Sequence, residues 1–155
     1  MTDRHGQFHL RLAVPADALR LARIHRAART SALPWLSALH TSEDDLAWMT
    51  NIVLPQQEVW VAGDGDPTGF ISLSETEVEH LYVDPAAWRS GAGSALLDRA
   101  KERRPGGFRL WTFQRNAMAR AFYRKHGLVE LRTTDGSGNE EKEPDVQLGW
   151  KLTGT

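Results

Sequence analysis

The sequence predicts an α/β fold, with a mixed central sheet of about six or seven strands and helices on both faces. Segments with the two-residue period of strands and segments of helical period follow one another in the order β-α-α-β-β-β-α-β-α-β-β. Residues 78–113 and 108–132 each have the order strand, helix, strand, which implies parallel neighbours with right-handed crossovers. Residues 58–74 instead predict an antiparallel hairpin around a turn rich in glycine and proline.

Each element follows from a local pattern. Residues 8–14 alternate apolar and polar side chains, and Pro15 suits the first turn of the helix that follows. Thr41 and the acids after it suit the start of a second helix, and Gly127 suits the end of the last one. The predicted strands are 8–14, 58–62, 68–74, 78–83, 108–113, 128–132 and 146–152, and the predicted helices are 15–29, 41–52, 90–104 and 116–126.

Composition favours one soluble domain that spans residues 1–155. The net charge of −1 gives no reason to expect nucleic acid or an anionic membrane as a partner. The absence of cysteine excludes disulfides, thiolate nucleophiles and cysteine-based metal sites, and the six histidines lack the spacing of a metal site, so no metal is expected. Residues 1–6 are polar, unlike a signal peptide, and no apolar run is long enough for a membrane span, so we expect a cytoplasmic protein.

The segment Leu81–Leu97 carries the clearest chemical signal. A strand ends at Asp84, and a short loop containing Gly91 and Gly93 then enters a helix. Glycines let a ligand approach the backbone, and the unpaired N–H groups of the first helical turn form an anion site, for which a pyrophosphate is a natural guest. A dinucleotide fingerprint would need a third glycine where Leu96 stands, so nicotinamide or flavin binding is not favoured.

Two motifs in this order resemble those of the GNAT superfamily of acetyl-CoA-dependent N-acetyltransferases. Leu-Tyr-Val-Asp-Pro, followed by Arg-x-Gly-x-Gly-x-x-Leu-Leu, is similar to the central acetyl-CoA motif, and Asn116–Leu128 is similar to the motif Asn-x-x-Ala-x-x-Phe-Tyr-x-x-x-Gly-Phe. The order of elements also matches that fold. One position departs from the pattern, because Trp88 stands where the phosphate loop commonly has glutamine or arginine, and Arg89 follows one residue later.

The resemblance implies roles for the donor side. Acetyl-CoA is the co-substrate, its thioester and pantetheine arm pair with the strand backbone, and its pyrophosphate lies on the loop and helix start. Tyr123 is the general acid that protonates the leaving thiolate. Asn116 contacts the coenzyme arm, although an N-cap role alone also explains it. The implied coenzyme-binding residues are Leu81, Tyr82, Val83, Arg89, Ser90, Gly91, Ala92, Gly93, Ser94, Asn116 and Tyr123.

The general base and the acceptor site are less closely defined. Glu79 is the first choice for the base, Glu77 the second, and a water relay competes with both. A change of side-chain parity between Val78 and Leu81 is consistent with a β-bulge near residues 79–80, and bulges often lie beside active sites.

We expect the acceptor to be a small-molecule or peptide amine, bound by the first helix pair and by the loop between the last two strands. Trp35, His40 and Glu77 are the candidate acceptor-binding residues, although tryptophan in a helix hairpin is often core. Residues 135–145 hold five acids against one lysine. This charge either attracts a cationic amine or belongs to a mobile, solvated loop.

Two alternatives to an acetyltransferase stay open from the sequence. The first is a non-catalytic module of the same fold that senses acyl-CoA, and the second is a nucleotide-binding domain that binds NAD or ATP. Tyr123 argues against the sensor, because a degenerate site readily loses its acid. The oligomeric state is also open, with a homodimer as one alternative.

Overall fold

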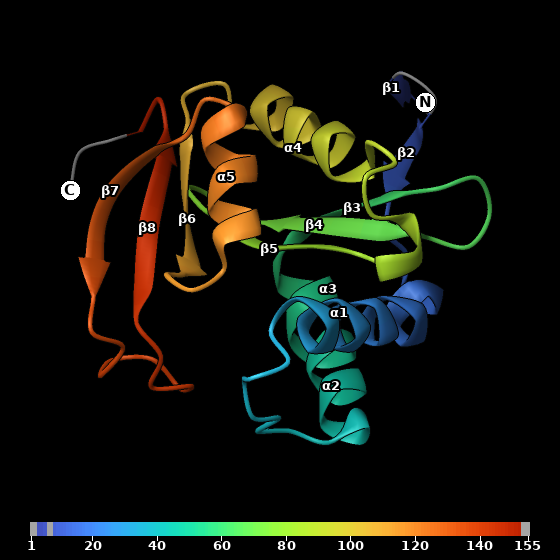
Figure 1. Ribbon diagram of the computed structural model, residues 1–155. Coiled ribbons are helices and arrows are strands. Elements are labelled where there is room, and N and C mark those ends of the chain that lie inside the picture. The colour runs from blue at the N-terminus through green and yellow to red at the C-terminus, as the bar shows by residue number, and fades with distance from the viewer. Residues whose placement is uncertain (1–2, 6–7, 153–155) are drawn as a thin grey trace.

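The computed structural model describes residues 3–5 and 8–152, and its elements follow the predicted order (Figure 1). Residues 1–2 and 6, part of the segment predicted not to be a signal peptide, lie outside the described residues. The strands are β1 (Asp3–His5), β2 (Phe8–Leu12), β3 (Glu58–Ala62), β4 (Gly69–Leu73), β5 (Val78–Val83), β6 (Phe108–Phe113), β7 (Val129–Thr134) and β8 (Asp145–Trp150). The helices are α1 (Ala18–Ala32), α2 (Ser42–Trp48), α3 (Leu54–Gln56), α4 (Ala92–Arg103) and α5 (Ala117–Lys125).

The predicted α/β fold with helices on both faces is confirmed, but the sheet is divided in two. The first sheet has the strand order β1-β2-β3-β4-β5 and the second has the order β6-β8-β7, and all their pairs are antiparallel. The parallel neighbours expected in residues 108–132 are not adjacent, because β8 lies between β6 and β7. The last strand to be synthesised thus separates two that a local crossover would have joined.

The two sheets meet where β5 and β6 begin. Glu77 and Arg109 form an isolated parallel bridge, and the Arg109 N–H donates to the Thr76 carbonyl oxygen at 3.0 Å. Beyond this bridge β5 and β6 belong to different sheets. The strands expected to be parallel neighbours in residues 78–113 therefore pair at one end and then separate. This splay exposes the edge of β5 at the centre of the molecule.

Helices cover both faces of the first sheet. Consecutive side chains of β4 point to opposite sides, as the two-residue period of a strand requires. Ile71 packs in the cluster that contains Leu96 of α4, whereas Phe70 packs in the cluster that contains Leu21 of α1. Figure 1 shows α4 on one face of this sheet and α1 and α2 on the other.

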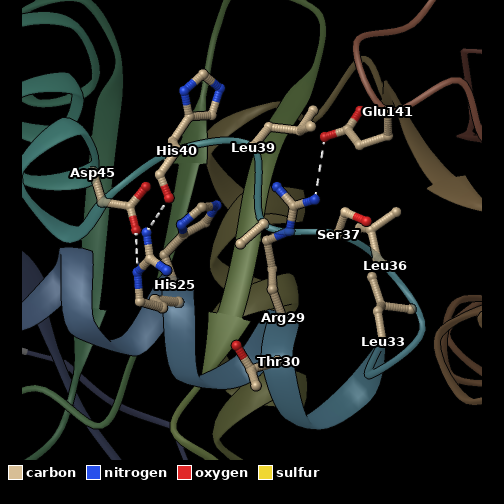
Figure 2. A pocket seen from close by; sticks show the side chains of 12 residues that line it. His25, Arg29, Thr30, Leu33, Leu36, Ser37, Leu39, His40, Asp45 and Glu141 are labelled. Carbon is tan, nitrogen blue, oxygen red and sulfur yellow. Dashed lines mark hydrogen bonds and ion pairs between the residues drawn. The ribbon is translucent and has the colours of Figure 1, made fainter.

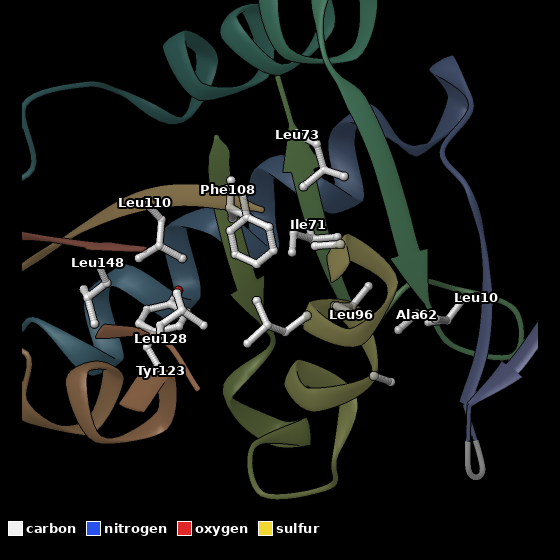
Figure 3. Packing of buried hydrophobic residues seen from close by; sticks show 14 of the residues in the cluster. Leu10, Ala62, Ile71, Leu73, Leu96, Phe108, Leu110, Tyr123, Leu128 and Leu148 are labelled. Carbon is white, nitrogen blue, oxygen red and sulfur yellow. The ribbon is translucent and has the colours of Figure 1, made fainter. Parts of the chain in front are cut away.

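The cluster beneath α4 continues into the second sheet and holds the two sheets together. Phe108 and Leu110 of β6 lie in it with Leu148 of β8 (Figure 3). Tyr123 of α5 and the following Leu128 close this end of the core. A continuous apolar core therefore packs against both sheets where β5 and β6 separate.

The second predicted helix is longer than expected and changes its winding. It continues past Ile52 through a π turn (Met49–Val53) into α3. The Leu54 N–H donates to the Met49 carbonyl five residues earlier, and Pro55 has no N–H with which to continue an ordinary α-helical pattern. Met49 and Val53 are fully buried against the first sheet, so packing holds the distorted turn in place.

Candidate functional site

A β-bulge in β5 turns two consecutive side chains toward one cleft. Ser72 pairs with His80 and Leu73 pairs with Val78, which leaves Glu79 as the extra residue. The bulge expected near residues 79–80 is therefore confirmed. Glu79 and His80 both line the cleft described below, an arrangement that a regular strand forbids because its neighbours alternate.

The backbone of β5 presents alternate residues to the splay. The Asp84 N–H donates to the Thr68 carbonyl at 2.8 Å, so the backbone groups at position 84 point toward the chain of β4. By the two-residue period, Tyr82 also bonds β4, whereas the N–H and C=O groups of Leu81 and Val83 point away from it, toward β6. Of the three residues predicted to contact the acetyl group through their backbone, two face the splay.

Trp88, the residue that departs from the family pattern, forms a hydrogen bond with one of these backbone groups. Its indole Nε1–H donates to the Val83 carbonyl oxygen at 2.8 Å. The side chain is thus folded back onto the end of β5 and fixes the path of the loop into α4. Trp88 therefore positions this loop, and glutamine or arginine at the same place would do so through a different side chain.

The loop before α4 has two residues in the left-handed region. Gly91 is the N-cap of α4 with φ of 98°, and Arg89 has φ of 64°. Left-handed residues next to a helix start orient successive N–H groups toward one point, which makes an anion-binding concavity. Arg89, Ser90 and Gly91 are exposed, so a ligand can reach them.

The remaining residues of the predicted pyrophosphate segment, 92–94, pack inside the protein at the start of α4. Ala92 is buried, and a Cβ added at Gly93 would stand 3.4 Å from the ring of Phe122. The Ser94 hydroxyl lies 3.0 Å from Nε2 of His126. The small residues at 92 and 93 therefore let α4 and α5 approach each other.

Tyr123 is buried and Asn116 caps α5. The Asn116 Oδ1 accepts from the Ala119 N–H at 3.1 Å, so the N-cap role is established. Tyr123 is 9% exposed, and burial, followed by the nearby phenol of Tyr82, raises the pKa of Tyr123 above its usual range. Because Tyr82 belongs to β5, the Tyr123 hydroxyl lies within electrostatic range of the strand next to the splay. The phenol therefore keeps its proton at neutral pH.

A cleft of about 1040 Å³ lies on the α1 and α2 side of the splay. It is bounded by the two sheets, by the first helix pair and by the loop between β7 and β8, as expected for the acceptor site. Its lining comprises His25, Arg29, His40, Asp44, Asp45, Trp48, Glu79, His80, Tyr82, residues 111–113, Thr134, residues 137–141 and Asp145.

An aromatic cluster forms the floor of this cleft. The rings of His25 and Trp48 are 4.9 Å apart, those of Trp48 and His80 are 4.8 Å apart, and those of His25 and Tyr82 are 4.7 Å apart. Burial, followed by the positive charge of Arg29, lowers the pKa of His25 to about 3 and that of His80 to about 4. Both imidazoles are therefore neutral near pH 7 and add no positive charge where a cationic amine would arrive.

The two candidate bases have different surroundings. Glu79 is exposed and lines the cleft. Glu77 lies at the bridge to Arg109, and burial, followed by the charge of Glu79, raises its pKa, while Arg109 opposes the change. The cleft lining includes Glu79 and not Glu77, so the geometry favours the first choice.

The acidic loop between β7 and β8 is fastened to its surroundings. Glu141 pairs with Arg29 at 3.1 Å and Glu143 with Arg115 at 3.0 Å, and Glu140 is hydrogen-bonded to the His40 ring at 2.5 Å. Asp145 accepts from the Thr134 hydroxyl. Two of the loop's glutamates are thus paired with arginines, and the contacts of Glu141 and Glu140 connect the loop to α1 and to the segment before α2.

The structure separates the other predicted acceptor residues. His40 lines the cleft at its exposed edge and is held by Glu140. Trp35 lies beside the cleft. The Arg115 guanidinium is 3.6 Å from the centre of the Trp35 ring, and the ring centroids of Trp35 and Phe113 are 6.4 Å apart in an edge-to-face arrangement. Its contacts are with neighbouring side chains, in line with a packing role.

Sequence reasoning missed His25, Arg29 and His80 as members of the site. In the sequence, His25 shares the helical spacing of Leu21, Ile24 and Ala28, which indicates only a residue on the buried face of a helix. His80 lies two residues before Tyr82, and this spacing placed both side chains on one face of the strand. The sequence carried no signal that α1 would bring His25 to this face of β5.

Two further findings concern the described residues as a whole. Every helix within residues 3–5 and 8–152 is too short or too polar to cross a lipid bilayer. No three side chains of the metal-binding types gather there in a group that could hold an ion.

Comparisons with known proteins agree with this architecture. The sequence profile of the acetyltransferase (GNAT) domain matches residues 55–130. The chain is 28% identical over 110 residues to the peptidyl-lysine N-acetyltransferase YjaB of Salmonella typhimurium strain LT2, covering 70% of this chain and 74% of that protein. The solution structure of apo YjaB from Escherichia coli superposes with a TM-score of 0.77 at 22% identity, covering 92% of this chain and 97% of that one. PaiA N-acetyltransferase from Thermoplasma acidophilum, solved in complex with coenzyme A, gives a TM-score of 0.70 at 18% identity over 94% and 99% of the two chains.

Proposed function

Because the chain belongs to the GNAT acetyltransferase family and is an acyltransferase, we propose that it transfers acetyl from acetyl-CoA to an amine by direct attack in a ternary complex. The acceptor is a small-molecule amine, a peptide N-terminus or a lysine side chain. The observation that carries this proposal is the splay between β5 and β6, which turns backbone groups of Leu81 and Val83 toward a ligand and opens beside the acceptor cleft.

The residues present fit the donor substrate. A pantetheine arm carries amides that pair with a strand edge, and such an edge is offered by the N–H and C=O groups of Leu81 and by the N–H group of Val83, whose carbonyl already accepts from Trp88. The pyrophosphate of coenzyme A needs N–H donors and room, and the left-handed Gly91 at the start of α4 supplies both. Arg89 stands exposed in the same loop and adds a positive charge. The coenzyme supplies the acetyl group as a thioester, and PaiA of similar fold was solved in complex with coenzyme A.

Two side chains of this protein would move protons. Glu79, at the bulge, would accept a proton from the arriving ammonium, so that the nitrogen lone pair becomes available. A water molecule between the amine and Glu79 would serve the same purpose. Tyr123, kept protonated by burial, would donate its hydroxyl proton to the departing sulfur.

The cleft would select and orient the amine. The neutral imidazoles of His25 and His80 leave the carboxylate of Glu79 as the nearest charge to an entering ammonium on the β5 side. Peptide lysine deserves priority among acceptors because the Salmonella relative is named a peptidyl-lysine N-acetyltransferase.

A panel assay tests this function. The protein is incubated with acetyl-CoA and separate lysine peptides, peptide N-termini, polyamines and aminoglycosides, and the free thiol released is measured together with the mass of the acceptor. Amine-dependent thiol release with one acetyl group added is the expected result. Tight binding of acetyl-CoA without amine-dependent thiol release across the panel would favour an acyl-CoA sensor instead.

A further inference from the structure

A smaller cavity, here called the side pocket, adjoins the acceptor cleft. It has a volume of about 80 Å³ and lies between α1 and the segment that leads into α2 (Figure 2). Five residues line both the side pocket and the cleft, namely His25, Arg29, His40, Asp45 and Glu141. The side pocket therefore lies next to the place where a group attached to an amine in the cleft would sit.

The charges around the side pocket are compensated within the protein. Arg26 Nε donates to the Asp45 carboxylate at 2.7 Å, and Arg29 donates to the Glu141 carboxylate at 3.1 Å. A charged occupant would have to displace one of these pairs or be buried without a counter-ion, which is unfavourable. The side pocket is therefore suited to an uncharged group.

His25 supplies a polar group that the fold itself does not use. The side chain is 8% exposed, and its Nδ1 is buried without a hydrogen-bond partner among the described residues. A neutral imidazole has one N–H donor and one acceptor nitrogen. Because a shielded N–H is the more costly group to leave unpaired, Nδ1 carries the lone pair and Nε2 carries the hydrogen.

The His25 ring lies at the boundary between the side pocket and the cleft. Figure 2 shows the His25 imidazole projecting from α1 between the side chains of Asp45 and Arg29. Leu33, Leu36 and Leu39 give the same cavity an aliphatic wall. The imidazole of His25, the hydroxyls of Thr30 and Ser37 and the aliphatic wall together match a short chain that ends in an oxygen acceptor.

We propose that the side pocket binds a hydroxyl or carboxamide group carried by the acceptor next to its reactive amine, and that His25 donates a hydrogen bond to the oxygen of that group. This inference rests on the proposed function, since it assigns the amine to the cleft. Acceptors that lack the oxygen leave His25 unpaired beside an apolar group and bind less well.

Steady-state kinetics with matched peptides test the pocket. Two tripeptides contain lysine and alanine after either asparagine or its apolar isostere leucine, so each offers both an α-amine and a lysine amine. We expect a KM about tenfold lower for the asparagine peptide, the factor that one good hydrogen bond gives. In His25→Phe, which keeps an aromatic ring beside Trp48 and Tyr82, the two peptides should have equal KM values.

His9→Phe is the matched control, because His9 lies on β2 beside Asp64 and outside the cleft lining. It should keep the tenfold preference. A preference that persists in His25→Phe, or that is absent from the wild type while both peptides are acetylated, overturns the pocket assignment and leaves the acetyltransferase proposal intact.

A binding measurement decides the matter independently of turnover and of variants. The wild-type protein with ¹⁵N-labelled histidine is titrated with propionamide, and the imidazole nitrogens are followed by NMR. We expect the His25 nitrogens to shift and those of His9 to stay. A shift at His25 without acetylation of any amine would support the pocket while contradicting the proposed function, and no shift at His25 up to the solubility of propionamide would overturn the pocket.

Discussion

Replacing Gly91 by alanine should separate coenzyme binding from folding. Gly91 has φ of 98° and ψ of 0° at the N-cap of α4. A residue with a Cβ pays about 1–2 kcal/mol for this left-handed conformation. The added Cβ would also stand 3.3 Å from Cε2 of Phe8, a contact that a half-buried ring on β2 can relax by a small shift. The folded state should survive, because small proteins have about 5–15 kcal/mol of stability.

Coenzyme affinity should fall by more than the stability does. The alanine restrains the turn that aims the first N–H groups of α4, and hydrogen bonds to charged groups contribute about 1.5–3 kcal/mol each. The loss of one such bond predicts a Kd for coenzyme A that rises at least about tenfold. Isothermal titration calorimetry with coenzyme A measures this change, and thermal unfolding measures the loss of stability in the same samples.

Gly65→Ala provides the matched control. Gly65 has φ of 103° in the exposed turn between β3 and β4, and a Cβ there would meet nothing within 4 Å. The substitution therefore imposes similar backbone strain outside the loop that enters α4. An unchanged Kd in Gly91→Ala, or an equal rise in Kd in Gly65→Ala, would refute the assignment of the α4 N-terminus to the pyrophosphate.

Three further outcomes are expected. Tyr123→Phe should lower kcat by about 100-fold or more while the Kd for coenzyme A changes less than about threefold; an unchanged kcat with a confirmed acceptor would remove Tyr123 from the proton step. Glu79→Gln should lower kcat/KM by about 100-fold or more and Glu77→Gln should change it far less, whereas the reverse result would make Glu77 the base. The folded-state pKa values of His25 and His80 lie below the unfolded value of 6.5, so stability should be full above pH 6.5 and fall as the pH drops from 6.5 toward 4, by about 2 kcal/mol for each imidazole at pH 5. Urea unfolding of wild type and His25→Phe at pH 5 and pH 7.5 checks this last expectation, and equal pH dependence in the two proteins would contradict it.

The sequence by itself determined the local structure and the donor motif. Side-chain periodicity, Pro15, the cap at Thr41 and the glycines before α4 act within a few residues, so the elements can be predicted from neighbours along the chain. The bulge in β5 was also predictable, because it changes the parity of apolar side chains within one strand.

Only the tertiary structure decided how these elements meet. The insertion of β8 between β6 and β7 and the splay of β5 from β6 depend on pairings between distant residues, for which the local pattern contains no register.

The acceptor site was decided in the same way. Packing of α1 and α2 on the far face of β5 brought His25 and Trp48 against His80, and contacts with Arg29 and His40 hold the acidic loop in place. A loop that the sequence presented as a net negative charge is therefore a partly compensated wall of the cleft. Formal charge follows from composition, but its compensation depends on which distant cations the fold brings within about 4 Å.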